Sequence, residues 1–355
     1  METKGTTSSK ARGVGSGGMS SEASVWADVL IYASVFTFLS LCVSAYSLRG
    51  HLNNFTSPQY QLYICRILLL VPLYALSAWG SIVVPDASLY LSAIRDCYEA
   101  YVIYTFFSLL LAFLGGEHDL GEWLELKGHI RHTWPFSICF RIIKLGPHFL
   151  RRVKQGTLQF VFVKPFTAIV AIVLSYRGLY DEGNFSFEQG YLYLSIINNV
   201  SITISLYSLV LFYIATETRL EPYRPLVKFV AIKSVVFLLY WQSCIIELLC
   251  ILSIGLMETS TATLYGNALV CFEMFLAAIV HHFAFPFSDY VKDDSTYSIF
   301  AKAREAEKNP LIPKIVKVLN VKDVISDGRQ VFFKKGRIDE ELADQPTTGS
   351  VHETI

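Results

Sequence analysis

Charge is scarce in this sequence. Only 17% of its 355 residues are Asp, Glu, Lys or Arg, and 30 basic residues balance 30 acidic ones. Soluble domains carry about 25% charged residues, and binding to nucleic acid needs a basic surface that neutralises phosphates. The composition therefore argues against a soluble domain and against a nucleic-acid partner.

Several motifs and ligand sets are also missing. The sequence has no Walker A element and no H-E-x-x-H, so ATP-driven transport and metalloprotease chemistry lack support, and no enzymatic activity is expected. His281 and His282 are adjacent and point in different directions on a helix, so we expect no metal or other cofactor. Six of the seven cysteines lie in apolar segments, which argues against a disulfide framework.

Long apolar stretches dominate the chain instead. An α-helix needs roughly 20 apolar residues to cross the ~30 Å hydrocarbon core of a bilayer. Seven stretches are of this kind: residues 25–46, 61–84, 89–114, 157–176, 189–215, 226–254 and 265–285. The predicted fold is an all-α polytopic membrane protein with seven transmembrane helices.

The distribution of basic residues predicts the orientation. One side of the predicted membrane carries Lys4, Lys10, Arg12 and Arg177, whereas the other loops and the C-terminal tail carry the remaining 21 Lys and Arg outside the spans. Basic residues collect on the cytosolic side of membrane proteins. The N-terminus is therefore predicted to be outside or lumenal, and the C-terminus cytosolic.

The segments outside the spans are polar. Residues 1–24 are rich in Gly, Ser and Thr and are expected to be a disordered tail rather than a signal peptide. The cytosolic loop 115–156 includes a basic amphipathic stretch, Pro135 to Lys154, predicted to lie on the inner leaflet. Cys139 there is a candidate for lipidation. Residues 286–355 are expected to be mostly disordered, with a short helix near Tyr297 to Lys308.

Charged side chains occur inside the predicted spans. Each costs at least ~2.5 kcal/mol at the bilayer centre and should face a partner or a wet cavity. Away from the ends of the spans they are the cations Arg66, Arg95, Lys164 and Lys233 and the anions Asp96, Glu99, Glu247 and Glu273. Equal numbers of both signs favour internal pairing. The charges either line a polar cavity for an amphipathic solute or lock helices together.

Several short motifs resemble a known family. They are Arg95-Asp96-Cys97-Tyr98-Glu99-Ala100, Lys154-Gln155-Gly156-Thr157-Leu158-Gln159-Phe160, Lys164-Pro165, and Lys233-Ser234-Val235 followed by Trp241-Gln242. Over about residues 25–325 the chain resembles the organic solute transporter alpha-subunit family, closest to its single-chain transmembrane protein 184 group. Leu319 to Asp327 is similar to the stretch that follows the membrane domain in that family.

This resemblance implies seven helices with the N-terminus outside, and passive, ATP-independent movement of steroid-like or other amphipathic organic solutes. Bile-acid transporting members work with a small single-span beta subunit; here that partner and a homodimer both stay open, beside contacts with membrane lipids. Members often carry a run of cysteines in the cytosolic loop, where this chain has only Cys139.

A solute site follows as a hypothesis. Arg66, Lys164 and Lys233 would meet an anionic head group. Asp96 and Glu99 would hold these cations while the site is empty. The predicted substrate-binding set is completed by Asn198, Trp241 and Gln242.

Two other functions remain as alternatives. Seven spans also suit a receptor, although the seventh span has no N-P-x-x-Y element and no lysine for a retinal Schiff base. A signalling or trafficking scaffold could use the basic loop and the tail to bind anionic lipid. The plasma membrane and endosomal or vacuolar membranes all suit spans of this length.

Overall fold

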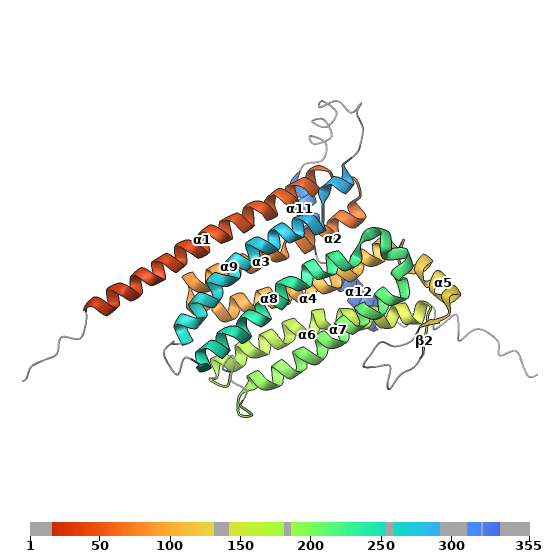
Figure 1. The fold of residues 1–355 in the computed structure, drawn as a ribbon. Coiled ribbons are helices and arrows are strands. Elements are labelled where there is room, and N and C mark those ends of the chain that lie inside the picture. Colours follow the sequence, from red (N-terminus) through yellow and green to blue (C-terminus); the bar gives the residue numbers. More distant parts are fainter. Residues whose placement is uncertain are drawn as a thin grey trace, which may run out of the picture.

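The protein is a bundle of long helices. The computed structural model describes residues 16–130, 142–180, 186–252, 259–291, 311–320 and 322–333. Its long helices lie side by side along one axis (Figure 1). They are α1 (Ser16–Asn53), α2 (Pro58–Leu68), α3 (Leu70–Val83), α4 (Ser88–Phe113), α6 (Pro147–Tyr176), α7 (Gly190–Leu220), α8 (Pro225–Leu252) and α9 (Thr259–Ala284).

Shorter elements connect the long helices. Single 3-10 turns follow α3, α7 and α9, at η1 (Pro85–Ala87), η3 (Glu221–Tyr223) and η4 (Phe287–Tyr290). The loop after α4 forms α5 (Glu117–Lys127) and a two-stranded antiparallel ladder in which β1 (His129–Ile130) pairs with β2 (Ile143–Lys144). Two further helices, α11 (Leu311–Leu319) and α12 (Lys322–Phe333), come from the C-terminal region.

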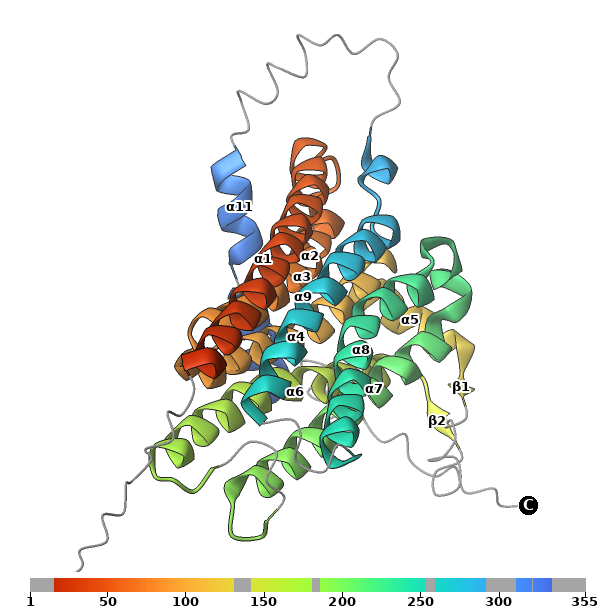
Figure 2. The same cartoon turned by 60° about the vertical axis from the view of Figure 1, so that its left-hand side comes forward.

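The bundle has two halves that share α4. On one side α1 packs on α9 and α3, and α9 also contacts α8. On the other side α6 and α7 form a close pair, and α4 packs on both α3 and α6. Figure 2 shows α6 and α7 together at one side of the bundle and α1 at the other. Helix α4 therefore connects the two halves.

Six helical segments of the described chain are long and apolar enough to cross a membrane. They are Ser24–Asn53, Pro58–Val83, Pro85–Phe113, Pro147–Tyr176, Gly190–Tyr223 and Thr263–Tyr290. Large apolar side chains on their outer faces, such as Phe38, Phe166 and Ile169, are exposed to more than 60%. Exposed apolar area on this scale suits lipid rather than water. The predicted class, an all-α polytopic membrane protein, is confirmed.

The predicted span 61–84 is interrupted in the structure. Helix α2 ends at Leu68 and α3 begins at Leu70. Pro72 has no backbone N–H to donate to the carbonyl of Leu68, which loosens the helix at this point. Pro165, in contrast, lies within the continuous helix α6. Proline therefore leaves a one-residue turn at Leu69 in the first stretch, which remains one spanning segment, and no break in the second.

The loop 115–156 and the tail differ from the sequence expectation. In the described part of the stretch Pro135 to Lys154, Ile143–Lys144 form β2 and α6 already begins at Pro147. Proline is favoured at the first position of a helix because its missing N–H needs no partner there. Within the tail, residues 311–319 and 322–333 are helical and pack on the bundle. Cys139 and the segment Tyr297 to Lys308 lie outside the described residues.

Small and polar residues bring α6 and α7 together. Gln159 Nε2 donates to the carbonyl of Ser201 at 2.6 Å, and the Ser201 hydroxyl donates back to Gln159 Oε1 at 2.6 Å. At Gly156, an added Cβ atom would overlap the side chain of Ser208. Only glycine permits this close approach of the two helices.

We expect Gly156→Ala to destabilise the bundle by about 1–3 kcal/mol, because the new methyl group overpacks the contact with Ser208. Thermal unfolding of the purified protein in detergent measures the effect. Adding Ser208→Gly removes the obstructing hydroxymethyl group and should recover most of the loss, with Ser208→Gly alone as the control. Equal melting temperatures for Gly156→Ala and the unmodified protein would contradict this account.

Candidate functional site

The polar residues of α4 form the centre of the candidate site. Arg95, Asp96 and Glu99 lie within four residues of one another, so their side chains share one side of the helix. Their partners come from the helices packed around α4. This arrangement joins separate parts of the bundle through charge.

Asp96 binds two cations. Its Oδ2 lies 3.0 Å from Nζ of Lys164 on α6, and its Oδ1 lies 3.2 Å from Nε of Arg95. The Arg95 guanidinium also lies over the ring of Tyr74, 5.4 Å from its centroid. Asp96 therefore connects α4 to α6 and still has a cation beside it when Lys164 moves.

Glu99 connects α4 to two other helices. The hydroxyl of Tyr74 on α3 donates to Glu99 Oε2 at 2.9 Å, and Nζ of Lys233 on α8 lies 3.5 Å from Oε1. Both charged side chains are mostly buried, with 18% of Lys233 and 13% of Glu99 exposed. Their shielding from water strengthens the attraction and also makes separation expensive.

A cavity of about 300 Å³ opens beside these ion pairs, between α4, α6 and α7. Its wall is part polar and part apolar. Thr167 on α6 donates to Asn198 Oδ1 on α7 at 2.8 Å, which fixes two of the polar groups. The rings of Tyr180 and Tyr191 meet edge to face, with centroids 5.9 Å apart. The polar lining is Ser92, Asp96, Glu99, Lys164, Thr167, Tyr180, Tyr191, Ser195, Asn198 and Asn199, and the apolar lining is Leu89, Ala93, Phe160, Ala168, Ala171, Leu194 and Ile202.

The structure brings together half of the predicted site. Asp96, Glu99, Lys164 and Asn198 all line the cavity. Lys233 is joined to this group through Glu99. Residues of four helices thus meet at this point, where Asp96 is paired with Lys164 and Glu99 with Lys233.

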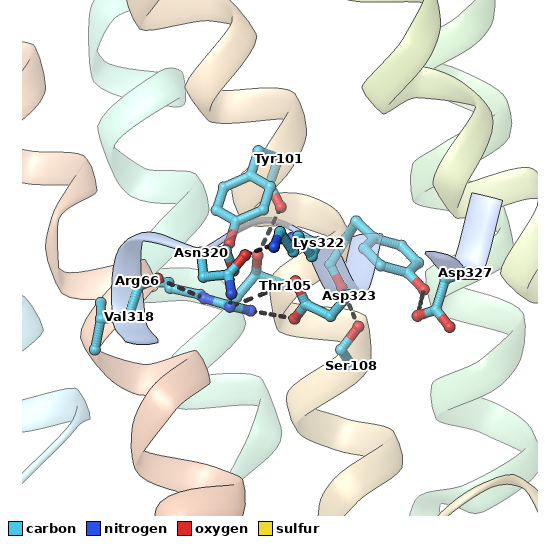
Figure 3. Close-up of polar contacts among 10 residues, drawn as sticks. Arg66, Tyr101, Thr105, Ser108, Val318, Asn320, Lys322, Asp323 and Asp327 are labelled. Carbon is cyan, nitrogen blue, oxygen red and sulfur yellow. Dashed lines mark hydrogen bonds and ion pairs between the residues drawn. The ribbon is translucent and has the colours of Figure 1, made fainter. Parts of the chain in front are cut away.

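Arg66, in contrast, lies apart from the cavity. Its guanidinium points to the C-terminal segment, where it binds Asp323 and the carbonyl oxygens of Val318 and Asn320 (Figure 3). These partners lie more than 250 residues away in the sequence. The sequence therefore indicates that Arg66 needs an anion, but it does not show which residue supplies it.

Trp241 and Gln242 lie on α8, away from the cavity lining. Half of the Trp241 side chain is exposed, and its ring meets Phe237 edge to face. Gln242 is buried and donates from Nε2 to the carbonyl of Gly266 on α9 at 2.7 Å. The Gln242 contact joins α8 to α9 and suits helix packing, whereas the contact of Trp241 with Phe237 lies within α8.

Other candidates are placed as follows. The side chain of Glu247 lies outside the described residues, as does Cys139. Nowhere in the described ranges do three His, Cys, Asp or Glu side chains gather in a way that could hold a metal ion. Sequence reasoning missed Tyr74 and Thr167, which are polar groups facing the charged residues of α4 or the cavity. Their only signal was a hydroxyl inside an apolar stretch.

Comparison with known proteins identifies the relatives of this chain. Residues 29–290 match the family described as organic solute transporter Ostalpha. The chain is also similar to a transmembrane protein 184 homologue from Dictyostelium discoideum, with 38% identity over 281 residues. That alignment covers 76% of this chain and 54% of the relative, so the chain spans about half of the relative's length. No solved structure matches the chain.

A double-mutant cycle tests the link between Glu99 and Lys233. We expect Lys233→Met alone to destabilise the protein by about 3–5 kcal/mol, because it leaves a mostly buried carboxylate without its cation. In the Glu99→Gln background the same change should be less harmful by at least ~1 kcal/mol. Unfolding in detergent gives the four free energies. Additive effects would show that the two side chains do not interact.

Proposed function

Because this chain belongs to the organic solute transporter Ostalpha family, we propose that it is a membrane transporter that carries amphipathic organic solutes passively, without ATP. The solutes proposed are steroid-like anions, such as steroid sulfates and bile acids. The observation that carries this proposal is the cavity beside Asp96, Glu99 and Lys164, which combines ion-paired groups with an apolar wall.

The geometry supports a simple exchange at Lys164. In the empty site Lys164 is paired with Asp96. An anionic head group that enters the cavity takes the place of Asp96 as the partner of Lys164. Asp96 then keeps Arg95 as its cation, 3.2 Å away. No charge is left unpaired at either stage, so the barrier to binding and release stays low.

The remaining lining suits the body of such a solute. Phe160, Leu194 and Ile202 offer apolar contact, while Asn198 and Thr167 offer hydrogen bonds. A volume of about 300 Å³ is at the lower end for small-molecule pockets. It accommodates a head group and part of a steroid body, so we propose that the rest of the solute lies between helices toward the lipid.

The proposed topology has seven spans. Helices α2 and α3 together form the second span, and α8 is a span in addition to the six apolar segments. The N-terminus is outside or lumenal, in keeping with the basic residues on the other side. The proposed location is the plasma membrane or an endosomal or vacuolar membrane. Cys139 is the proposed lipidation site. The proposed protein partner is a second copy of the chain or a single-span beta subunit.

The test is uptake of radiolabelled steroid sulfate and bile acid into proteoliposomes that contain only this purified chain. We expect saturable uptake without ATP, and at least a tenfold loss with Lys164→Ala. The protein should still fold, because Asp96 keeps its contact with Arg95.

Lys144→Ala is the matched control, since Lys144 is an exposed lysine on β2 outside the cavity lining. Its uptake should equal that of the unmodified chain. A folded Lys164→Ala protein with unchanged uptake would contradict the proposed site. Loss of folded protein in Lys164→Ala would instead assign the ion pair to helix locking.

A further inference from the structure

A second group of buried cations lies on the face formed by α2, α4 and α6. The side chains of Arg66 on α2 and Lys154 on α6 are each only 5% exposed. Neither lines the transport cavity. Both are instead paired with carboxylates of α12, which comes from the C-terminal region.

Arg66 is held by several acceptors at once. Nη1 donates to Asp323 at 2.5 Å, Nη2 donates to the carbonyl of Asn320 at 2.5 Å, and Nε donates to the carbonyl of Val318 at 2.9 Å. Figure 3 shows the guanidinium directed at this segment, with Asp323 at one end of its fork. The Arg66 guanidinium carbon also lies 6.0 Å from the centroid of the Tyr101 ring.

Lys154 has a similar environment one turn further along α12. Its Nζ lies 3.1 Å from Asp327 and also contacts Glu117 at the start of α5. The hydroxyl of Tyr104 donates to Asp327 at 2.6 Å. Asp323 and Asp327 are four residues apart, so they lie on the same face of α12 and reach the two cations together.

The two sides of these ion pairs differ in burial. The cations are 5% exposed, whereas 40% of the Asp323 side chain and 32% of the Asp327 side chain are exposed. Arg66 and Lys154 therefore lie beneath the two carboxylates, which are closer to the surface of the protein. On α12, Gly328 lies directly on the ring of Phe162, where a Cβ atom would overlap it, so the helix can lie close to α6.

A buried cation cannot be left without an anion at low cost. Removing one partner of a buried ion pair is strongly unfavourable, because the remaining charge keeps its desolvation penalty. Lys154 keeps Glu117 when α12 leaves, but Arg66 loses Asp323, so α12 can leave this face easily only if another anion takes the place of Asp323 beside Arg66. Release of α12 and binding of an anion are then two aspects of the same equilibrium.

We propose that Arg66 and Lys154 form a second anion site, which binds a phosphate group and which Asp323 and Asp327 of α12 occupy in its absence. An arginine fork and a lysine are the side chains that recognise phosphate oxygens. The phosphate comes from a lipid head group or from free phosphate in solution. This inference does not depend on the transport proposal, since the site and its occupant are distinct from the cavity.

The first test uses the unmodified full chain in nanodiscs and measures hydrogen exchange in α12. One arm compares phosphatidylcholine discs with discs that also contain phosphatidic acid, and the other compares inorganic phosphate with chloride at equal ionic strength. We expect exchange of residues 322–333 to rise severalfold in at least one arm, with exchange of α3 unchanged. The arm that responds identifies the source of the phosphate.

The second test measures binding of dioctanoyl phosphatidic acid and of inorganic phosphate to variants. Asp323→Asn with Asp327→Asn removes the internal competitor and should tighten binding of the responding probe at least tenfold. Lys322→Gln, an exposed change on the same helix, should leave it unchanged. Adding Arg66→Gln to the double variant should abolish the gain.

Two results would overturn the inference. One is unchanged exchange of α12 in both arms of the first test. The other is a double variant that folds, as judged by thermal unfolding, and binds both probes no better than the unmodified chain. If the double variant fails to fold, the exchange measurement on the unmodified chain still decides the matter.

Discussion

The interaction on which this structure depends is the pairing of charges that are shielded from water. An unpaired charge inside a helical membrane bundle is expensive, so each buried cation determines which segment must lie beside it. Asp96 holds Lys164 of α6, Glu99 holds Lys233 of α8, and Arg66 holds the tail at Asp323. Because the first two anions stand on α4, this one helix organises both halves of the bundle.

The same constraint explains why a polar cavity can exist beside apolar helices. Lys164 is paired with Asp96, Lys233 with Glu99, and Asn198 is bound by Thr167, so each of these polar groups has a partner. Under the proposed function, such a wall would exchange Asp96, the internal partner of Lys164, for an anionic group of the solute. Pairing would then stabilise the empty site and still allow it to bind.

Much of the fold could be predicted from the sequence, because a helix that crosses lipid must be long, apolar and internally hydrogen-bonded. The sequence also predicts that Asp96 and Glu99 share one face of a helix and that each needs a cation as its partner. Other parts required the structure. No local pattern shows that Arg66 pairs with Asp323, since the two residues are 257 positions apart. The sequence places Trp241 and Gln242 in an apolar span, but the direction of the Gln242 side chain around α8 depends on packing against α9.

The close contact at Gly156 has a consequence for how the cavity can open. Helices α6 and α7 interlock through Gly156 and Ser208 and through the reciprocal hydrogen bonds of Gln159 and Ser201. Sliding one helix along the other would break these bonds and drive side chains into each other. These contacts favour movement of α6 and α7 as one unit, with α4 as the wall whose position relative to them can change. Widening of the cavity at the α4–α6 boundary would have to separate Asp96 from Lys164, which are paired at 3.0 Å.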